Sequence, residues 1–335
     1  MRDGPHVLGR RAIAVAVVLV VAVACGDDGG AAGAPETGSV RLYTSVSEET
    51  VDAVVSAFES DNPDVQVEVF RAATGDLNAR IASEERSGGI EADVIWASDP
   101  LSMQAWDEQG LLSHGWTPDG ASDVADSFKA EAFWGTRLLY MVIVHHKGVD
   151  PAPSSWRDLA APEYRDLVEI PDPGFAGSAL AMLGYLADEP SYGIDFYRDL
   201  KANGARQVAS PDDIVTDVAE GRADAGITLE FSGRTAAEAG SPVEVVWPEP
   251  GAVSIYSPIG ITASPSNEEA ARSFVESVLS VEGQEAIAST GWAPVLPGVE
   301  GPPVPPDATI VNPDWASLFS RQSDLLEEYR SIFEG

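Results

Sequence analysis

The residues best placed to bind a ligand lie where a glycine-containing turn enters a predicted helix. Gly177 and Ser178 follow the turn Pro-Asp-Pro-Gly at 171–174. Free backbone N–H groups and the helix dipole at such a start favour an anion. Ser210 opens the segment Ser-Pro-Asp-Asp and adds a hydroxyl donor. At both places an ordinary helix cap is the alternative interpretation.

Two acids, Glu230 and Asp99, follow apolar segments that we predict to be strands. Carboxylates at strand ends hold an ammonium group or another cation. Together with the Gly177–Ser178 segment they suit a zwitterion such as an aminophosphonate, although acids solvated in loops are the alternative. Loop residues beside them complete the predicted ligand-binding set, which adds Ser45, Ser47, Ser98, Phe231 and Ser232. The pair His145-His146 makes a poor chelate, since neighbours on a strand point to opposite faces.

The start of the chain resembles a signal peptide followed by a flexible linker. Arginines precede an apolar run at 12–24, which is typical of a secretory signal and too short for a comfortable membrane span. Cys25 follows directly, and this junction resembles a bacterial lipoprotein cleavage site. We therefore predict a signal peptide at 1–24, lipidation of Cys25 and a flexible tether at 25–38. An ordinary secreted protein with an incidental cysteine is the alternative.

Charge and cysteine content exclude several classes of protein. The 335 residues carry 20 Lys+Arg against 54 Asp+Glu, a net charge of −34, and such an acidic surface repels nucleic acid. A single cysteine forms no internal disulfide and no cysteine-based metal cluster. The excess of acids mildly favours a cationic or metal-bearing solute. We expect no cofactor, and the sequence identifies no metal ligands.

The elements that position these residues alternate between strands and helices. Val51, Val54 and Phe58 have helical spacing after a short strand at 40–44, and further strands follow at 65–70 and 92–96. This pattern predicts an α/β fold, whose ligands bind at the carboxyl ends of the strands. The length exceeds one comfortable core. We predict one lobe from 39–138 plus 260–297, a second lobe from 139–259, and a proline-rich loop and helix at 298–335 that packs on both.

Five short motifs then resemble bacterial extracellular solute-binding proteins, and more narrowly the ferric-iron, thiamine and aminophosphonate group of ABC importers. They lie, in order, at 92–96, 153–164, 170–178, 221–225 and 280–284. The resemblance implies a two-lobe periplasmic-binding-protein-like fold with hinge strands near Tyr140 and Tyr256. It also implies capture of a small solute or metal chelate by hinge closure and delivery to an ABC permease. We expect a monomer, lipid-anchored on the extracytoplasmic face of the cell membrane.

Iron is the ligand that the resemblance leaves most open. Ferric members commonly place two tyrosines where this chain has Phe231 and Ser232, so direct coordination by tyrosinate is in doubt, while iron bound as a chelate stays open. The chain has no Gly-x-Ser-x-Gly, His-Glu-x-x-His or Walker-type segment. We therefore predict a binding protein and no enzyme. A sensing lipoprotein not coupled to import, and an exported hydrolase, are the alternatives.

Overall fold

The computed structural model describes residues 38–335, and its first part is an alternation of parallel strands and helices. The apolar residues of α1 fall on one face, so that Val51, Val54 and Phe58 are buried. The predicted strand–helix order is confirmed here. The elements are β1 (Gly38–Thr44), α1 (Glu48–Asp61), β2 (Val65–Arg71), α2 (Thr74–Ser87), β3 (Val94–Trp96) and α3 (Pro100–Glu108).

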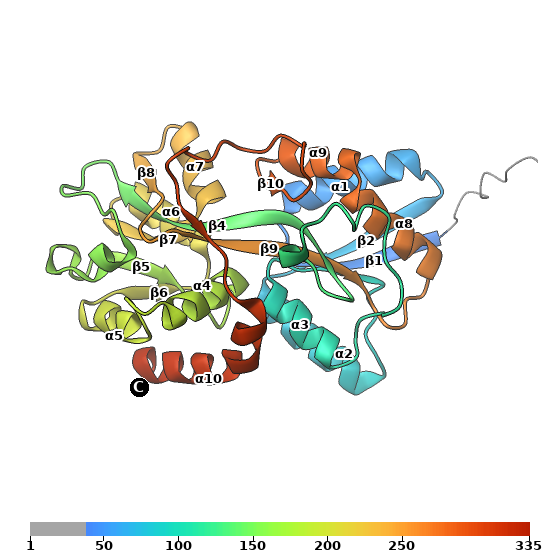
Figure 1. The fold of residues 1–335 in the computed structure, drawn as a ribbon, viewed down its shortest axis with the longest axis horizontal. Helices are drawn as coiled ribbons and strands as arrows, with labels where there is room; N and C mark the ends of the chain where they lie inside the picture. Colours follow the sequence, from blue (N-terminus) through green and yellow to red (C-terminus); the bar gives the residue numbers. More distant parts are fainter. Residues whose placement is uncertain (1–37) are drawn as a thin grey trace, which may run out of the picture. The chain divides into compact units, whose positions relative to one another are not determined.

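Two long strands cross the middle of the sheet. They are β4 (Trp134–His146) and β9 (Ala252–Ile261), and they pair antiparallel with each other. The strand order is β2-β1-β3-β9-β4-β7-β5-β6, so β9 joins the first set of strands and β4 joins the second (Figure 1). Both strands are buried along nearly their whole length, as expected for central strands with both faces covered. Tyr140 and Tyr256 lie on them, which confirms the predicted crossing strands.

The second set of strands repeats the arrangement of the first. Its β5 pairs parallel with both β6 and β7, while β7 and β8 pair antiparallel with β4. The elements are β5 (Val168–Pro171), α4 (Gly177–Asp188), α5 (Asp195–Ala202), β6 (Arg206–Val208), α6 (Pro211–Ala219), β7 (Ala225–Leu229), α7 (Glu230–Glu238) and β8 (Val243–Val246). We predicted a loop at 229–233, and this is wrong, because α7 begins directly at the end of β7.

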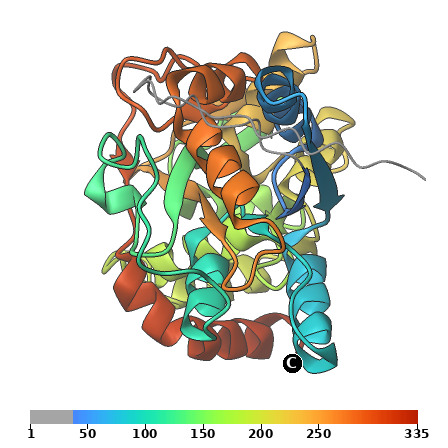
Figure 2. The same cartoon turned by 90° about the vertical axis from the view of Figure 1, so that its right-hand side faces the viewer.

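The chain then returns to the first set of strands before a last helix. Helix α8 (Glu268–Leu279) packs on β1 and β9, and α9 (Val281–Ser289) packs on α1. Short strands β10 (Ala293–Pro294) and β11 (Ile310–Val311) follow. Helix α10 (Trp315–Phe333) contacts α3, α4 and α5, and both views show it below the strands (Figures 1 and 2).

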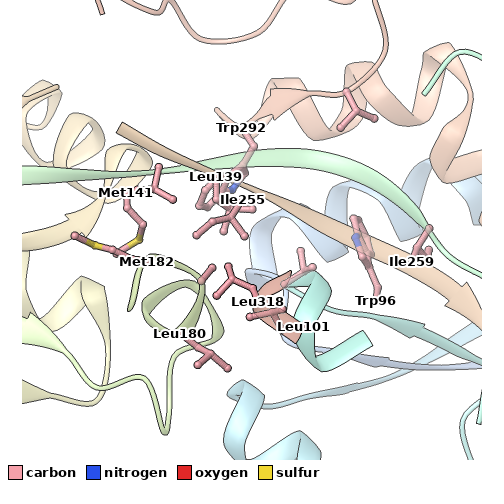
Figure 3. Packing of buried hydrophobic residues seen from close by; sticks show 14 of the residues in the cluster. Trp96, Leu101, Leu139, Met141, Leu180, Met182, Ile255, Ile259, Trp292 and Leu318 are labelled. Carbon is pink, nitrogen blue, oxygen red and sulfur yellow. The ribbon is translucent and has the colours of Figure 1, made fainter. Parts of the chain in front are cut away.

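The apolar core runs along β4 and β9 and continues to both sides of them. Trp96 is fully buried, and its Nε1 donates to the Thr136 hydroxyl at 2.8 Å. Figure 3 shows Leu139 and Ile255 at the centre of this core, with Trp292 close to them. Both sets of strands therefore pack on one continuous apolar core, which positions the polar residues at the ends of the strands.

The predicted signal peptide, Cys25 and nearly all of the tether lie outside the described residues. Within residues 38–335, no helix combines the length and the apolar character needed to cross a membrane.

Candidate functional site

A cavity of about 210 Å³ opens where the strand ends of the two sets face each other. Its wall comes from the loops after β1, β2, β3, β5 and β6, from the junction of β7 and α7, from β4 and from Trp292, as expected for an α/β sheet. Eight of the predicted ligand-binding residues line it, namely Ser45, Ser47, Ser98, Gly177, Ser178, Ser210, Phe231 and Ser232. A larger hollow of about 640 Å³ lies beside α3 and the start of α10, away from these strand ends.

Several helix N-termini meet at the cavity. Residues from the first turns or caps of α2, α4, α6 and α7 all belong to its wall. At α4 the cap residue Ala176 is extended and supplies no capping side chain. The first N–H groups of a helix have no partner inside the helix. These ends therefore present donors and positive dipole potential to the cavity.

Hydroxyl groups on the opposite wall are joined to one another. The Ser45 and Ser98 oxygens lie 3.0 Å apart, and the Ser98 backbone N–H donates to the Ser45 hydroxyl at 2.9 Å. The Thr74 hydroxyl lies 3.2 Å from that of Ser98. Each hydroxyl can rotate to donate or accept, so this wall adapts to the oxygen atoms of a ligand.

Arg137 is the functional residue that sequence reasoning missed. It lies on β4, lines the cavity and is only 2 % exposed. Its Nη1 donates to the Ser47 hydroxyl at 3.2 Å, whereas its buried Nε has no hydrogen-bond partner among the described residues. Burial, and then the charge of Arg71, lower the pKa of Arg137 to about 9. A buried arginine with an unused donor requires an acceptor.

Trp292 supplies a second unused donor in the same wall. Its Nε1 is buried and finds no partner within the described part of the chain. The Arg137 guanidinium carbon lies 4.1 Å from the centre of the indole ring, and the Phe231 ring stacks on the indole at 4.2 Å with an interplanar angle of 14°. Neither a guanidinium nor an indole N–H can accept a hydrogen bond. The two groups therefore select a ligand atom that accepts.

The structure does not bring the two predicted carboxylates to the cavity wall. Asp99 is fully buried, and its Oδ1 caps α3 by accepting from the Ser102 N–H at 2.8 Å. Glu230 accepts from Arg234 at 2.8 Å, one turn along α7. Burial raises the pKa of both carboxyl groups. Asp212 is the one acid in the described wall, and it accepts from the Ser232 hydroxyl at 2.5 Å.

A model of the family described as bacterial extracellular solute-binding protein matches residues 40–293. The chain belongs to this family. Its members bind solutes and are not enzymes, in agreement with the prediction of a non-enzymatic protein.

The relatives of this solute-binding protein are named after different ligands. The spermidine/putrescine-binding periplasmic protein of Escherichia coli (strain K12) is 28% identical over 224 residues, or 62% of this chain and 64% of that protein. The match thus spans just under two thirds of that relative's length. A putative 2-aminoethylphosphonate-binding periplasmic protein of Salmonella paratyphi A is 24% identical over 268 residues, or 72% of this chain and 77% of that protein.

A solved structure confirms the predicted fold. The periplasmic binding protein AfuA from Actinobacillus pleuropneumoniae, with exogenous fructose-6-phosphate bound, aligns with a TM-score of 0.80 at 19% identity. The alignment covers 89% of this chain and 99% of that chain. The solute-binding protein therefore has the two-lobe periplasmic-binding-protein fold, with β4 and β9 as the strands shared by both lobes.

Metal-binding side chains do not gather in the described part of this solute-binding protein. No group of three or more His, Cys, Asp or Glu side chains able to hold a metal ion occurs within residues 38–335. The cavity wall, as described, also contains no tyrosine or histidine. His145 and His146 lie at the end of β4, outside this wall.

Proposed function

We propose that this protein captures a small organic anion in its cavity by hinge closure and delivers it to an ABC permease. The observation that carries the proposal is Arg137, a buried cation in the cavity wall with an unused donor. A second cation, Arg71, lines the same wall, and its Nε donates to the Val46 carbonyl at 2.7 Å. Four helix N-termini add to the positive potential.

The rest of the solute is expected to be uncharged. An ammonium group needs carboxylate or carbonyl acceptors, and the acid that the described wall offers, Asp212, already accepts from Ser232. A polyamine would place several positive charges against Arg71 and Arg137. Like charges in a partly desolvated site repel strongly. The polyamine named for the relatives is therefore disfavoured in this cavity.

Bare ferric iron suits the wall equally poorly. Fe(III) prefers several hard anionic oxygen donors, and the described wall presents one carboxylate, that of Asp212, beside neutral hydroxyls and two guanidinium groups. A chelate brings its own carboxylates and presents an anionic outer surface. Iron bound through an organic acid thus falls within the proposed ligand class, while the free ion does not.

The location of the protein completes the proposal. A lipid on Cys25 would hold the receptor close to its permease, since two or more acyl chains anchor a protein stably. The crossing strands β4 and β9 would act as the hinge. We expect a monomer.

A binding screen on the purified protein tests the proposal. The panel contains ethylphosphonate, a sugar phosphate, citrate, ferric citrate, spermidine and ferric nitrilotriacetate. A ligand at 100 times its Kd adds about 2.7 kcal/mol of stability, which raises the melting temperature by roughly 5–11 °C. We expect shifts from anions. Shifts from spermidine alone would refute the proposal, and so would the absence of a shift from every anion and ferric chelate of the panel.

A further inference from the structure

Glu230, which we first predicted to be a ligand, forms part of a buried clasp beside the cavity. Its Oε1 accepts from Arg234 Nε at 2.8 Å, and Arg234 Nη2 donates to the Gly291 carbonyl at 2.6 Å. The two side chains are only 9 % and 18 % exposed. We use the term clasp for Glu230, Arg234 and this carbonyl.

The clasp ends next to the residue that contacts Arg137. Gly291 directly precedes Trp292, and a Cβ added at Gly291 would lie 3.2 Å from the Phe231 ring and 3.5 Å from Arg234. Gly291 also has a φ of +87°, which favours glycine. Here a glycine is needed both for its backbone conformation and for the close approach of α7. Two residues of α7 therefore fix the backbone just before Trp292: Arg234 bonds the Gly291 carbonyl, and the Phe231 ring packs close to Gly291.

The Trp292 indole in turn packs against the Arg137 guanidinium. Trp292 contacts the Phe231 ring and the Arg137 guanidinium, whose buried Nε has no partner among the described residues. The guanidinium has few other restraints among the described residues, the clearest being its 3.2 Å bond to Ser47. A shift of Trp292 would thus change where the unused donor points, and hydrogen bonds weaken steeply with misalignment.

We propose that Glu230 and Arg234 are positioning residues, which hold Trp292 so that Arg137 presents its free donor to the bound anion. The inference rests on the proposed function, which supplies the anion. It adds that Glu230 and Arg234 act through Trp292 without themselves lining the cavity. It also assigns Glu230 a role in anion binding, although a carboxylate in the cavity would repel an anion.

The protein contains a matched control pair. On α8, Glu268 Oε1 accepts from Arg272 Nη2 at 2.5 Å with the same spacing of four residues, and the Arg272 guanidinium lies 5.3 Å from the Trp116 ring. This pair lines a separate hollow, away from the candidate site. Glu268→Gln therefore removes a more exposed ion pair of the same spacing, also beside a tryptophan, without reaching Arg137.

The test compares Glu230→Gln with Glu268→Gln by two measurements. The first is the emission of Trp292, obtained by subtracting the spectrum of Trp292→Phe made in each background. The second is the Kd for inorganic phosphate, which serves as the probe anion in calorimetry. We expect Glu230→Gln to shift the Trp292 emission and to weaken phosphate binding about tenfold, with both quantities unchanged in Glu268→Gln.

Other outcomes separate this inference from the proposed function. An unchanged Trp292 emission and a phosphate Kd within twofold of wild type in Glu230→Gln would overturn the clasp. Equal losses in both glutamine variants would also overturn it. If Glu230→Gln does not fold, Arg234→Lys, which keeps the charge but not the paired N–H groups, gives the same readouts. If wild type binds neither phosphate nor any anion of the panel, the proposed function fails, while the emission still tests the clasp.

Discussion

Replacing Arg137 by methionine is expected to stabilise the unliganded protein and to remove its affinity for anions. The two effects have opposite signs because the guanidinium is buried before the ligand arrives. Its Nε has no partner among the described residues, and the nearby charge is the positive Arg71. Methionine replaces the arginine side chain up to about the position of Nε with a flexible apolar chain, and it brings no charge that needs solvation.

The magnitude follows from the pKa of Arg137. Each pKa unit corresponds to about 1.4 kcal/mol, so the fall from 12.5 to about 9 sets an upper limit on the order of 5 kcal/mol for burying the charge. The bond to Ser47 and the contact with Trp292 each offset about 1 kcal/mol of that cost. We expect a net gain of about 1–3 kcal/mol in the free energy of unfolding, in the range found when buried charges are replaced by apolar side chains.

The loss of anion affinity is expected to be larger than the gain in stability. Removing one partner of a buried, hydrogen-bonded charge pair costs about 2–5 kcal/mol, which weakens binding roughly 30- to 5000-fold. The assay is urea unfolding of wild type and Arg137→Met, each with and without the anion that the screen identifies. Arg272→Met is the control, since it removes an arginine that lies beside Trp116 and outside the cavity.

The reasoning is refuted if Arg137→Met unfolds at a lower urea concentration than wild type and still gains stability from the anion. That result would show that Arg137 holds the fold together and does not bind the solute. A loss of stability in Arg272→Met equal to that in Arg137→Met would indicate a general effect of removing an arginine.

Three further predictions concern the same cavity. Affinity for a carboxylate ligand should fall as the pH rises through about 9, because the Arg137 guanidinium, whose pKa is about 9, then loses its proton. Calorimetry between pH 7 and pH 10 measures this, and a Kd that does not change over this range contradicts the prediction. Ethylphosphonate should bind at least as tightly as 2-aminoethylphosphonate in calorimetry, since the described wall offers no free carboxylate; a tenfold preference for the amine contradicts this. Gly177→Ala should weaken anion binding at least tenfold, because its Cβ would lie 2.0 Å from Asp99 Oδ2 and would displace the start of α4. Adding Asp99→Gly removes the obstructing atoms and should restore the affinity. If this double variant stays weak, the steric explanation is wrong.

The fold was predictable because its signals are local. The helical spacing in α1 and the alternation of strands and helices are short-range patterns, and the structure confirms the elements they predicted. The crossing strands were predicted from the family resemblance, and the burial of β4 and β9 along nearly their whole length agrees with their central position. The start of α7 was missed because Phe231 and Ser232 lack an obvious capping residue before them, and Leu229 is the cap.

The hydroxyl wall of the site was predictable from one rule, and the cations were not. Ser45 and Ser98 follow predicted strands, so the rule that ligands bind at carboxyl strand ends brings them together, whereas Ser210 was predicted from its place at the start of a helix. Arg137 and Trp292 come from distant segments, and their contact is a matter of tertiary packing. A single arginine just before the long apolar run of β4 was the available signal, since a charge on a buried strand needs a partner.

The charge of the whole chain favours a cationic solute, whereas the cavity favours the proposed anion, and screening explains this difference. A net charge of −34 favours cations near the surface, but the Debye length at physiological ionic strength is only about 8 Å. Inside the cavity the potential comes from the nearest groups, which are Arg71, Arg137 and the helix N-termini. Glu230 also shows that near neighbours decide the effect of a charge. Its carboxylate is paired with Arg234, which offsets the negative charge near the solute. The ligand of such a receptor is therefore better inferred from unpaired donors and acceptors in the cavity than from the balance of acids and bases along the sequence.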